Sequence, residues 1–235
     1  MELEPETLSS RTHRRALAGI VLLAAGTALA ASGCMGPIAS PTSVPASGDT
    51  KTEVRQVGRF TSVSVDGPLN VVLASGTGVE VQIEAAANLL PLVTTDLAGT
   101  DLAVGVAAPG FVSAKPVTVR ITSPVVTSLS LDGGSQGTME VTASSMTVSV
   151  SGGAVLRAIG TVKQLTVTAL GGSDAQLGEL TADTGLIRAA GGARATLKVV
   201  QQLTGTADSG SVITLAVAPV AQSVTTTGGA KVVGP

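Results

Sequence analysis

The sequence lacks most of the side chains that carry out enzyme chemistry. Among its 235 residues there is one histidine, His13, and one cysteine, Cys34, and both precede the part of the chain that we expect to fold. That part therefore offers no Ser-His-Asp triad, no Cys-His nucleophile pair and no zinc site of the usual His/Cys kind. We expect neither a metal nor another cofactor, and we do not expect an enzyme.

Aromatic and charged residues are also scarce. Trp and Tyr are absent, and Phe60 and Phe111 are the two phenylalanines, which excludes an aromatic cage for a cation. A formal net charge of -2 gives no basic footprint, so we expect no nucleic acid as a partner. What remains is an aliphatic chain, 44% hydrophobic and 13% charged, whose many Val and Thr residues favour strands.

The N-terminal residues have the features of an export signal. Arg11, Arg14 and Arg15 precede an apolar run at 16–31, and small residues follow up to Cys34. A charged start, a short apolar core and small residues at its end are typical of a secretory signal, and the run is too short for a comfortable membrane span. Plain basic residues favour the general secretory route, and a twin-arginine signal stays open.

The residues Ala-Ser-Gly-Cys that end at Cys34 resemble the lipobox of bacterial lipoproteins, with Ala31 where Leu is most common. The resemblance implies a signal peptide at 1–33 and a lipid-modified Cys34, palmitate included, whose acyl chains hold the exported protein at the outer face of the cell membrane. An ordinary exported protein with a free cysteine is the alternative. Residues 34–52 are rich in Pro, Ser, Gly and Thr, which predicts a flexible tether rather than a packed arm.

A single all-β domain is predicted over 53–235. Its first part, 53–126, alternates apolar and polar residues, as in the segment 79–84, where Val, Val and Ile alternate with Glu, Gln and Glu. That period of two is typical of strands with one buried face. Turn signals such as Asp66-Gly67 separate these stretches. We expect the strands of this part to cap the regular coils that follow.

From 127 to 235 a short glycine-rich motif recurs. Its first position recurs at intervals of 19, 19, 20, 18 and 19, at Gly133, Gly152, Gly171, Gly191, Ser209 and Gly228. The residues two and four places before it are mostly apolar, and the residue two places after it is always Ser or Ala. These aligned columns predict a parallel β-solenoid, or β-helix, whose coils stack at about 4.8 Å and bury their apolar faces against one another.

The repeated motif is interpreted as the corner of a coil, because two glycines in succession permit a tight turn. A phosphate cradle needs a strand-loop-helix context and usually a lysine, and a calcium-binding β-roll needs a nine-residue spacing. Neither pattern is present. The Ser/Ala column beside the motif indicates a crowded position where the corner meets the core.

The stretch from Arg55 to Val104 resembles the start of the putative auto-transporter adhesin head GIN domain family. The matching features, in order, are a strand that ends at Phe60, Val65-Asp66-Gly67, Leu69-Asn70-Val71, Asn88-Leu89-Leu90 and Gly99-Thr100-Asp101-Leu102. The sequence departs from the family at Pro68, which leaves the local turn open. The resemblance covers 52–235 and implies a right-handed β-solenoid at the bacterial surface, with an adhesin-like role and no catalytic residues to carry over.

The leading functional interpretation is a non-catalytic, membrane-anchored lipoprotein for surface interaction or scaffolding. A cell-surface protein or a glycan would be its partner, since a displayed β surface offers an edge or a face for binding. The unpaired strand edges at the ends of a solenoid add weak self-association as a further expectation.

Two other interpretations stay open. A polysaccharide-active enzyme could use paired carboxylates without histidine, and its candidates are Asp132, Asp174, Asp183 and Asp208. Solvated carboxylates at the corners are the simpler interpretation of these four residues. The run Thr225 to Thr227 suggests a flat face of Thr ladders that binds ice or mineral, but its equivalent columns in the other coils are interpreted as apolar.

Overall fold

The computed structural model describes residues 44–107 and 115–235. The predicted signal peptide (1–33), Cys34, the first ten residues of the predicted tether and Phe111 lie outside these described residues. In the described ranges, no helix is long and apolar enough to cross a membrane.

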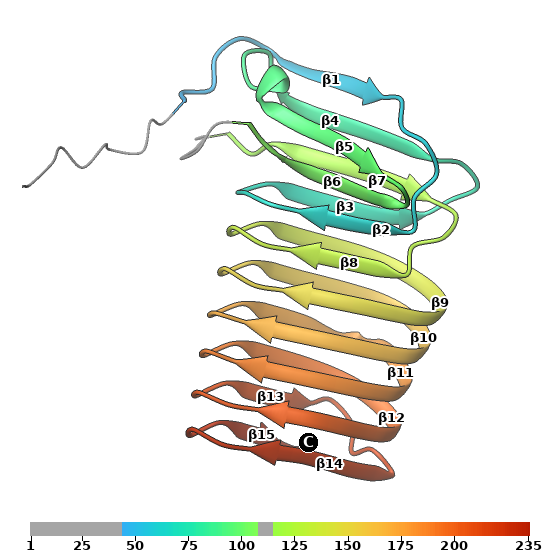
Figure 1. The fold of residues 1–235 in the computed structure, drawn as a ribbon, viewed down its shortest axis with the longest axis vertical. Coiled ribbons are helices and arrows are strands. Elements are labelled where there is room, and N and C mark those ends of the chain that lie inside the picture. Colours follow the sequence, from blue (N-terminus) through green and yellow to red (C-terminus); the bar gives the residue numbers. More distant parts are fainter. Residues whose placement is uncertain (1–43, 108–114) are drawn as a thin grey trace, which may run out of the picture. The chain divides into compact units, whose positions relative to one another are not determined.

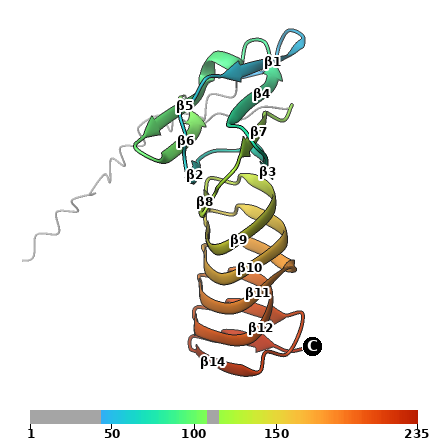
Figure 2. The same cartoon turned by 90° about the vertical axis from the view of Figure 1, so that its right-hand side faces the viewer.

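Seven strands and one short 3-10 helix precede the regular coils. They are β1 (Thr50–Arg55), β2 (Ser62–Val65), β3 (Asn70–Ser75), β4 (Glu80–Ala86), η1 (Leu90–Leu92), β5 (Val93–Ala98), β6 (Asp101–Val106) and β7 (Thr118–Ser123). The pairs β1–β4, β4–β7 and β5–β6 are antiparallel, whereas β2 and β3 pair in parallel with the first strands of the coils. Figure 2 shows this part stacked on one end of the coils.

The first described residues are in contact with these strands. Strand β1 begins at Thr50, within the stretch assigned to the tether. Val44 and Ala46 pack against the core. The Ser47 backbone N–H donates a hydrogen bond of 2.8 Å to the side-chain oxygen of Asn88.

Parallel strands wind into the predicted coils from residue 128 onwards. They are β8 (Ser128–Leu131), β9 (Gln136–Val150), β10 (Val155–Leu170), β11 (Asp174–Ala190), β12 (Arg194–Ala207), β13 (Val212–Leu215), β14 (Ala221–Thr226) and β15 (Lys231–Val233). Gln136 of β9 pairs with Val155 of β10, one 19-residue period later. The chain advances as a right-handed coil (Figure 1). The solenoid that the repeat predicted is confirmed.

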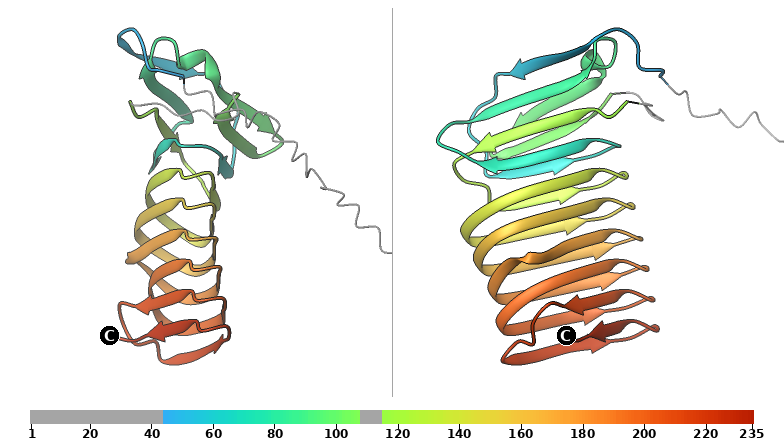
Figure 3. Two further views of the ribbon diagram at one scale, coloured as in Figure 1. Left: turned by 90° about the vertical axis from the view of Figure 1, so that its left-hand side faces the viewer. Right: turned by 180° about the vertical axis from the view of Figure 1, so that it is seen from behind.

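Each long strand covers two opposite faces of its coil. In β9 to β12 the first half lies on one face, the back face, and the second half lies on the other, the front face. The back-face sheet runs β1-β4-β7-β3, continues through the first halves of β9 to β12, and ends at β13 and β15. The front-face sheet runs β5-β6-β2-β8, continues through the second halves, and ends at β14. Figure 1 presents the front face, and the right panel of Figure 3 presents the back face.

The core consists of the apolar columns between the two faces. On the front-face side, Val148, Val167 and Ile187 occupy one column and are at most 2% exposed. The Ser/Ala column beside the corners is fully buried at Ser135, Ala154, Ser173, Ala193 and Ser211, which confirms that this position is crowded. The aliphatic side chains of one coil contact those of the next, so no coil buries its interior alone.

The glycine-rich motifs are the corners between the front and back faces. Gly152 has φ of 60° and Gly153 has φ of 78°, and the Ala154 N–H donates to the Ser151 carbonyl at 3.0 Å. Two successive residues with positive φ closed by such a bond form a type I′ turn. Ser209, with φ of 52°, is the one non-glycine residue with positive φ among the described residues. The corner interpretation is confirmed.

A β-bulge absorbs the one long repeat interval. Between β10 and β11, Arg157 pairs with Gln176 but Ile159 pairs with Glu179, so β11 has one extra residue on the back face. The front-face register between the two strands is unbroken from Gln164 to Leu170. The irregularity therefore stays on the back face, and the columns of the front face remain aligned.

Candidate binding face

The four candidate carboxylates lie in three different places. Asp132 and Asp208 occupy equivalent corner positions, and each accepts a hydrogen bond from the next backbone N–H, at 2.7 Å and 2.6 Å. Four coil steps separate these two corners, roughly 19 Å at about 4.8 Å per step. Asp174 begins β11 on the back face and accepts a bond from Gln176 at 2.9 Å. Asp183 is exposed at the bend between the two faces.

Hydrogen bonding holds Asp208 in its ionised form. The Thr227 hydroxyl, followed by the Ser209 backbone N–H, lowers the pKa of the Asp208 carboxyl below its ordinary value of 3.8. Hydrogen bonds to the charged form of a carboxylate act in this direction. A general acid needs a raised pKa, so the corner carboxylate suits a structural role.

The two carboxylates at equivalent corners are too far apart to act as an acid–base pair. Glycoside hydrolysis places two carboxyl groups within about 5 to 9.5 Å across one cleft, and the two equivalent corner residues, Asp132 and Asp208, are roughly twice that far apart. Among residues 44–107 and 115–235, no three His, Cys, Asp or Glu side chains gather closely enough to hold a metal ion.

The front face presents columns of hydroxyl side chains. Strand pairing aligns one outward column of Ser62, Ser128, Thr147, Thr166, Leu186, Thr204 and Ser223. A second outward column consists of Ser64, Ser130, Ser149, Thr168, Arg188, Thr206 and Thr225. The column of Thr225 was expected to be apolar in the other coils, and this expectation was wrong, because its members are Ser, Thr and Arg188. It holds for Thr226, which pairs with the buried Ala207.

The two faces differ in charge. On the front-face strand segments from β8 to β14, Arg188 is the sole charged residue. The back face carries acidic and basic side chains that pair with one another, as Arg157 does with Glu179 and Arg120 with Glu84, at 2.5 Å and 3.7 Å. From β8 to β14 the front face is therefore a nearly neutral, hydrogen-bonding surface.

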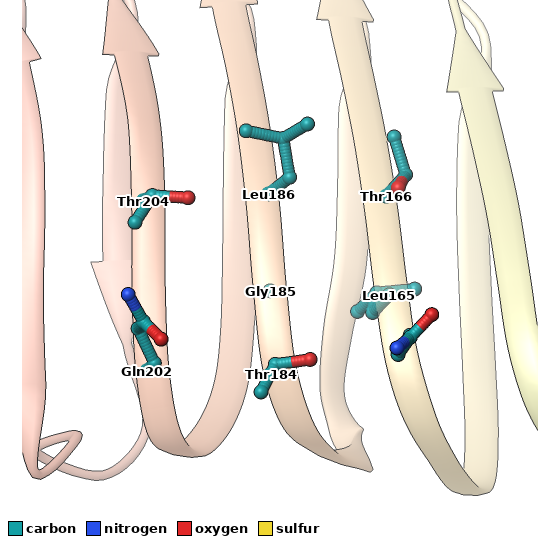
Figure 4. Close-up of a pocket in the computed structure, with 8 residues that line it drawn as sticks. Leu165, Thr166, Thr184, Gly185, Leu186, Gln202 and Thr204 are labelled. Carbon is teal, nitrogen blue, oxygen red and sulfur yellow. The ribbon is translucent and has the colours of Figure 1, made fainter.

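The middle of the front face departs from the hydroxyl pattern. Leu186 of β11 is 52% exposed and stands in a row between Thr166 and Thr204 (Figure 4). Gln164 and Gln202 flank Thr184 in the adjacent row. Together these side chains border a shallow, open depression of about 250 Å³.

The columns used to recognise the repeat lie two and four places before the first corner residue and two places after it. Their side chains point inward, so these columns reveal the core and not the surface. The front-face residues stand three, five and seven places before the first corner residue, between or beyond the apolar columns. Reading these positions down the repeats would have found the Ser/Thr columns and the two exceptions, Leu186 and Arg188, which sequence analysis missed.

A stack of β coils with a nearly neutral, hydroxyl-rich face, and with Asp132 and Asp208 at corners four coil steps apart, defines the class of β-solenoid modules. The chain belongs to the family described as "Putative auto-transporter adhesin, head GIN domain", whose model matches residues 59–219. The family assignment made from the sequence is thereby confirmed.

Solved structures share this fold. A protein described as a putative adhesin from Bacteroides fragilis is 15% identical and has a TM-score of 0.68; the match covers 82% of this chain and 100% of that one. A protein described as a putative lipid binding protein from Parabacteroides distasonis is 11% identical, with a TM-score of 0.51, and the match covers 82% and 99% of the two chains. At these identities the likeness concerns the fold. No curated protein matches the sequence.

Proposed function

We propose that the protein is an exported bacterial lipoprotein that displays a non-catalytic, adhesin-like β-solenoid on the outer face of the cell membrane. Residues 1–33 serve as the signal peptide, Cys34 carries the lipid, and the residues that follow it link the lipid to the domain. The part of the predicted tether from Val44 onwards packs on the solenoid domain that 53–235 form. The observation that carries the proposal is the short apolar run at 16–31 shortly before Cys34, in a chain whose residues 59–219 match an adhesin family.

A binding role is supported over a catalytic one by the position of the acidic groups. Asp132 and Asp208 cap corners, Asp174 is on the back face, and Asp183 is at the bend. The polysaccharide-active alternative requires two of them in one cleft. The partner would be a cell-surface protein or a glycan.

Weak self-association is a subsidiary part of the proposal. Strand β14 pairs with β12 and strand β15 with β13, and no other described strand pairs with either. Their free edges present backbone N–H and C=O groups that a second copy can satisfy. Light scattering after size exclusion would reveal a concentration-dependent dimer, and a monomer at high concentration would refute this part.

Labelling with a palmitate analogue tests the anchor. The full chain should incorporate the label and fractionate with membranes, and Cys34→Ser should lose both properties, because the chain has one cysteine. Ser43→Ala, in the predicted tether, is the matched control and should keep the label. An unlabelled wild-type chain would refute lipid anchoring.

Attachment tests the displayed module. Cells that carry the anchored chain should adhere to other cells or to extracellular matrix more strongly than cells that carry the Cys34→Ser chain. Equal adherence of the two strains would remove the support for an adhesin-like role.

A further inference from the structure

We infer that the front face of β10, β11 and β12 binds an acidic glycan, with Leu186 under a sugar ring and Arg188 on its carboxylate. This inference rests on the proposed function, because it names the ligand class of the displayed module. The site is a grid of three outward residues on each of three neighbouring coils. Its members are Gln164, Thr166 and Thr168 on β10, Thr184, Leu186 and Arg188 on β11, and Gln202, Thr204 and Thr206 on β12.

The polar side chains of this grid are available to a ligand. Thr184 donates its hydroxyl to the Lys163 carbonyl at 3.3 Å. The amides of Gln164 and Gln202 and the hydroxyls of Thr166 and Thr204 make no side-chain hydrogen bond within the described part of the chain. Side-chain amides and hydroxyls both donate and accept hydrogen bonds, as sugar hydroxyls do. Each of these side chains can therefore bind a sugar hydroxyl as a donor or as an acceptor.

Leu186 supplies the apolar element that a sugar ring needs. Its side chain is 52% exposed and is bordered by Thr166 and Thr204 on the neighbouring coils, where Figure 4 shows it standing out from the strand. A pyranose ring has one face of C–H groups, which gains by covering exposed hydrocarbon. Among the described residues the one aromatic side chain is Phe60, which is 2% exposed, so an aliphatic contact takes the place of ring stacking here.

Arg188 selects for a negative charge. It forms no ion pair within residues 44–107 and 115–235, whereas Arg157 on the back face pairs with Glu179. A guanidinium matches a carboxylate with two parallel hydrogen bonds. The strand residues around Arg188 on this face are otherwise uncharged. Asp208 stands at the corner two residues beyond Thr206, the partner of Arg188 on β12, and its carboxylate is already held by the Ser209 N–H and the Thr227 hydroxyl. A uronic acid unit over β11 can cover Leu186 with its C–H face and place its carboxylate on Arg188.

The geometry suits a chain of sugars that runs along the solenoid axis. Successive coils are about 4.8 Å apart, close to the length of one sugar unit in an extended glycan. One unit then lies over each of β10, β11 and β12, with the uronic acid in the middle. The Ser and Thr columns continue the same surface beyond the grid.

Two other occupants fit the face less well. Leu186 and Arg188 interrupt both hydroxyl columns, so the face is not the unbroken lattice of Thr that an ice or mineral surface would require. Protein interfaces depend on buried anchors that are often Trp, Tyr or Arg within a packed apolar centre. This face has one exposed Leu and one Arg among small polar residues, which favours a glycan.

Binding measurements on the full chain in detergent test the inference. The probes are three uronate polymers of different linkage, namely oligogalacturonate, alginate and hyaluronan, together with carboxyl-reduced forms of each. We expect at least one uronate to bind at least tenfold more tightly than its reduced form. Arg188→Gln should abolish that difference, and Leu186→Thr, which completes the hydroxyl column, should weaken both forms. Arg157→Gln on the back face should change neither.

Each outcome decides the inference. Binding to none of the uronates overturns it, as does equal binding by wild type and Arg188→Gln, or an equal loss in Arg157→Gln. Cell attachment that persists in Arg188→Gln and Leu186→Thr, and is lost when the surface proteins of the target cells are digested, overturns the glycan inference in favour of a protein partner and leaves the proposed function standing. Absence of both glycan binding and cell attachment refutes the proposed function as well.

Discussion

Alanine substitutions at the two corner glycines should differ in cost, because only the first glycine faces the preceding coil. At Gly153 an added Cβ would meet no atom within 4 Å. At Gly152 the same Cβ would fall on the carboxylate of Asp132 and 3.0 Å from the backbone nitrogen of Gly133. Both glycines have positive φ, so the backbone penalty is shared and the steric penalty is not.

The magnitudes follow from these contacts. A left-handed backbone conformation costs an alanine about 1 to 2 kcal/mol, and the reduced freedom of the unfolded chain returns about 0.4 to 1 kcal/mol. Gly153→Ala should therefore lower the free energy of unfolding by about 1 kcal/mol. Gly152→Ala adds overpacking of about 1 to 3 kcal/mol. Gly171→Ala, whose Cβ would meet Gly152 at an ordinary 3.7 Å, should resemble Gly153→Ala.

Urea denaturation followed by circular dichroism measures the three costs. The double variant Asp132→Ala/Gly152→Ala should recover part of the loss, since it removes the carboxylate that the new methyl group meets, and the recovery appears as a coupling free energy. Equal costs for Gly152→Ala and Gly153→Ala would refute the packing of corners on one another.

Four further substitutions have definite expected results. Ser135→Ala should raise the free energy of unfolding by about 1 kcal/mol, because the buried Ser135 hydroxyl has no hydrogen-bond partner among the described residues. Ser173→Ala should lower the free energy of unfolding by about 1 kcal/mol, because the Ser173 hydroxyl donates a buried hydrogen bond of 2.8 Å, and urea midpoints check both values. Asp208→Asn should be less stable than wild type at neutral pH, because the hydrogen bonds that lower the pKa of Asp208 stabilise the fold while the carboxyl is ionised. The difference should disappear as pH falls through this lowered pKa, below 3.8, and unfolding curves at several pH values check it. Arg157→Gln should change stability by less than about 1 kcal/mol, since its ion pair with Glu179 is exposed, and thermal unfolding checks that it is a fair control.

The sequence predicted the parts of the fold that require the same residue type at the same position of every repeat. A corner with two positive φ angles needs glycine or a small turn residue, so Gly152-Gly153 and its equivalents showed where the coils turn. The buried columns were visible because each coil must place an aliphatic side chain against the next, as Val148 does against Val167.

Features that depend on pairing between distant segments were not visible in the sequence. Strand β1 (Thr50–Arg55) is almost wholly exposed and has no apolar alternation; its backbone pairing with β4 makes it a strand. The front face was missed because outward residues of a sheet have no apolar signal, and the register of β10 to β12 brings Leu186 and Arg188 among the hydroxyls. The corner positions of Asp132 and Asp208, by contrast, followed from the repeat, because each directly precedes the first residue of a motif.

Binding of an acidic glycan to the front face can be observed residue by residue when the full chain is titrated with oligogalacturonate, alginate or hyaluronan and followed by methyl nuclear magnetic resonance. We expect the signals of Thr166, Leu186 and Thr204 on the front face to shift with at least one uronate, while those of Val155 and Val212 on the back face stay unchanged. Shifts confined to the back face, or no shift of Leu186 with any of the three, would contradict this expectation.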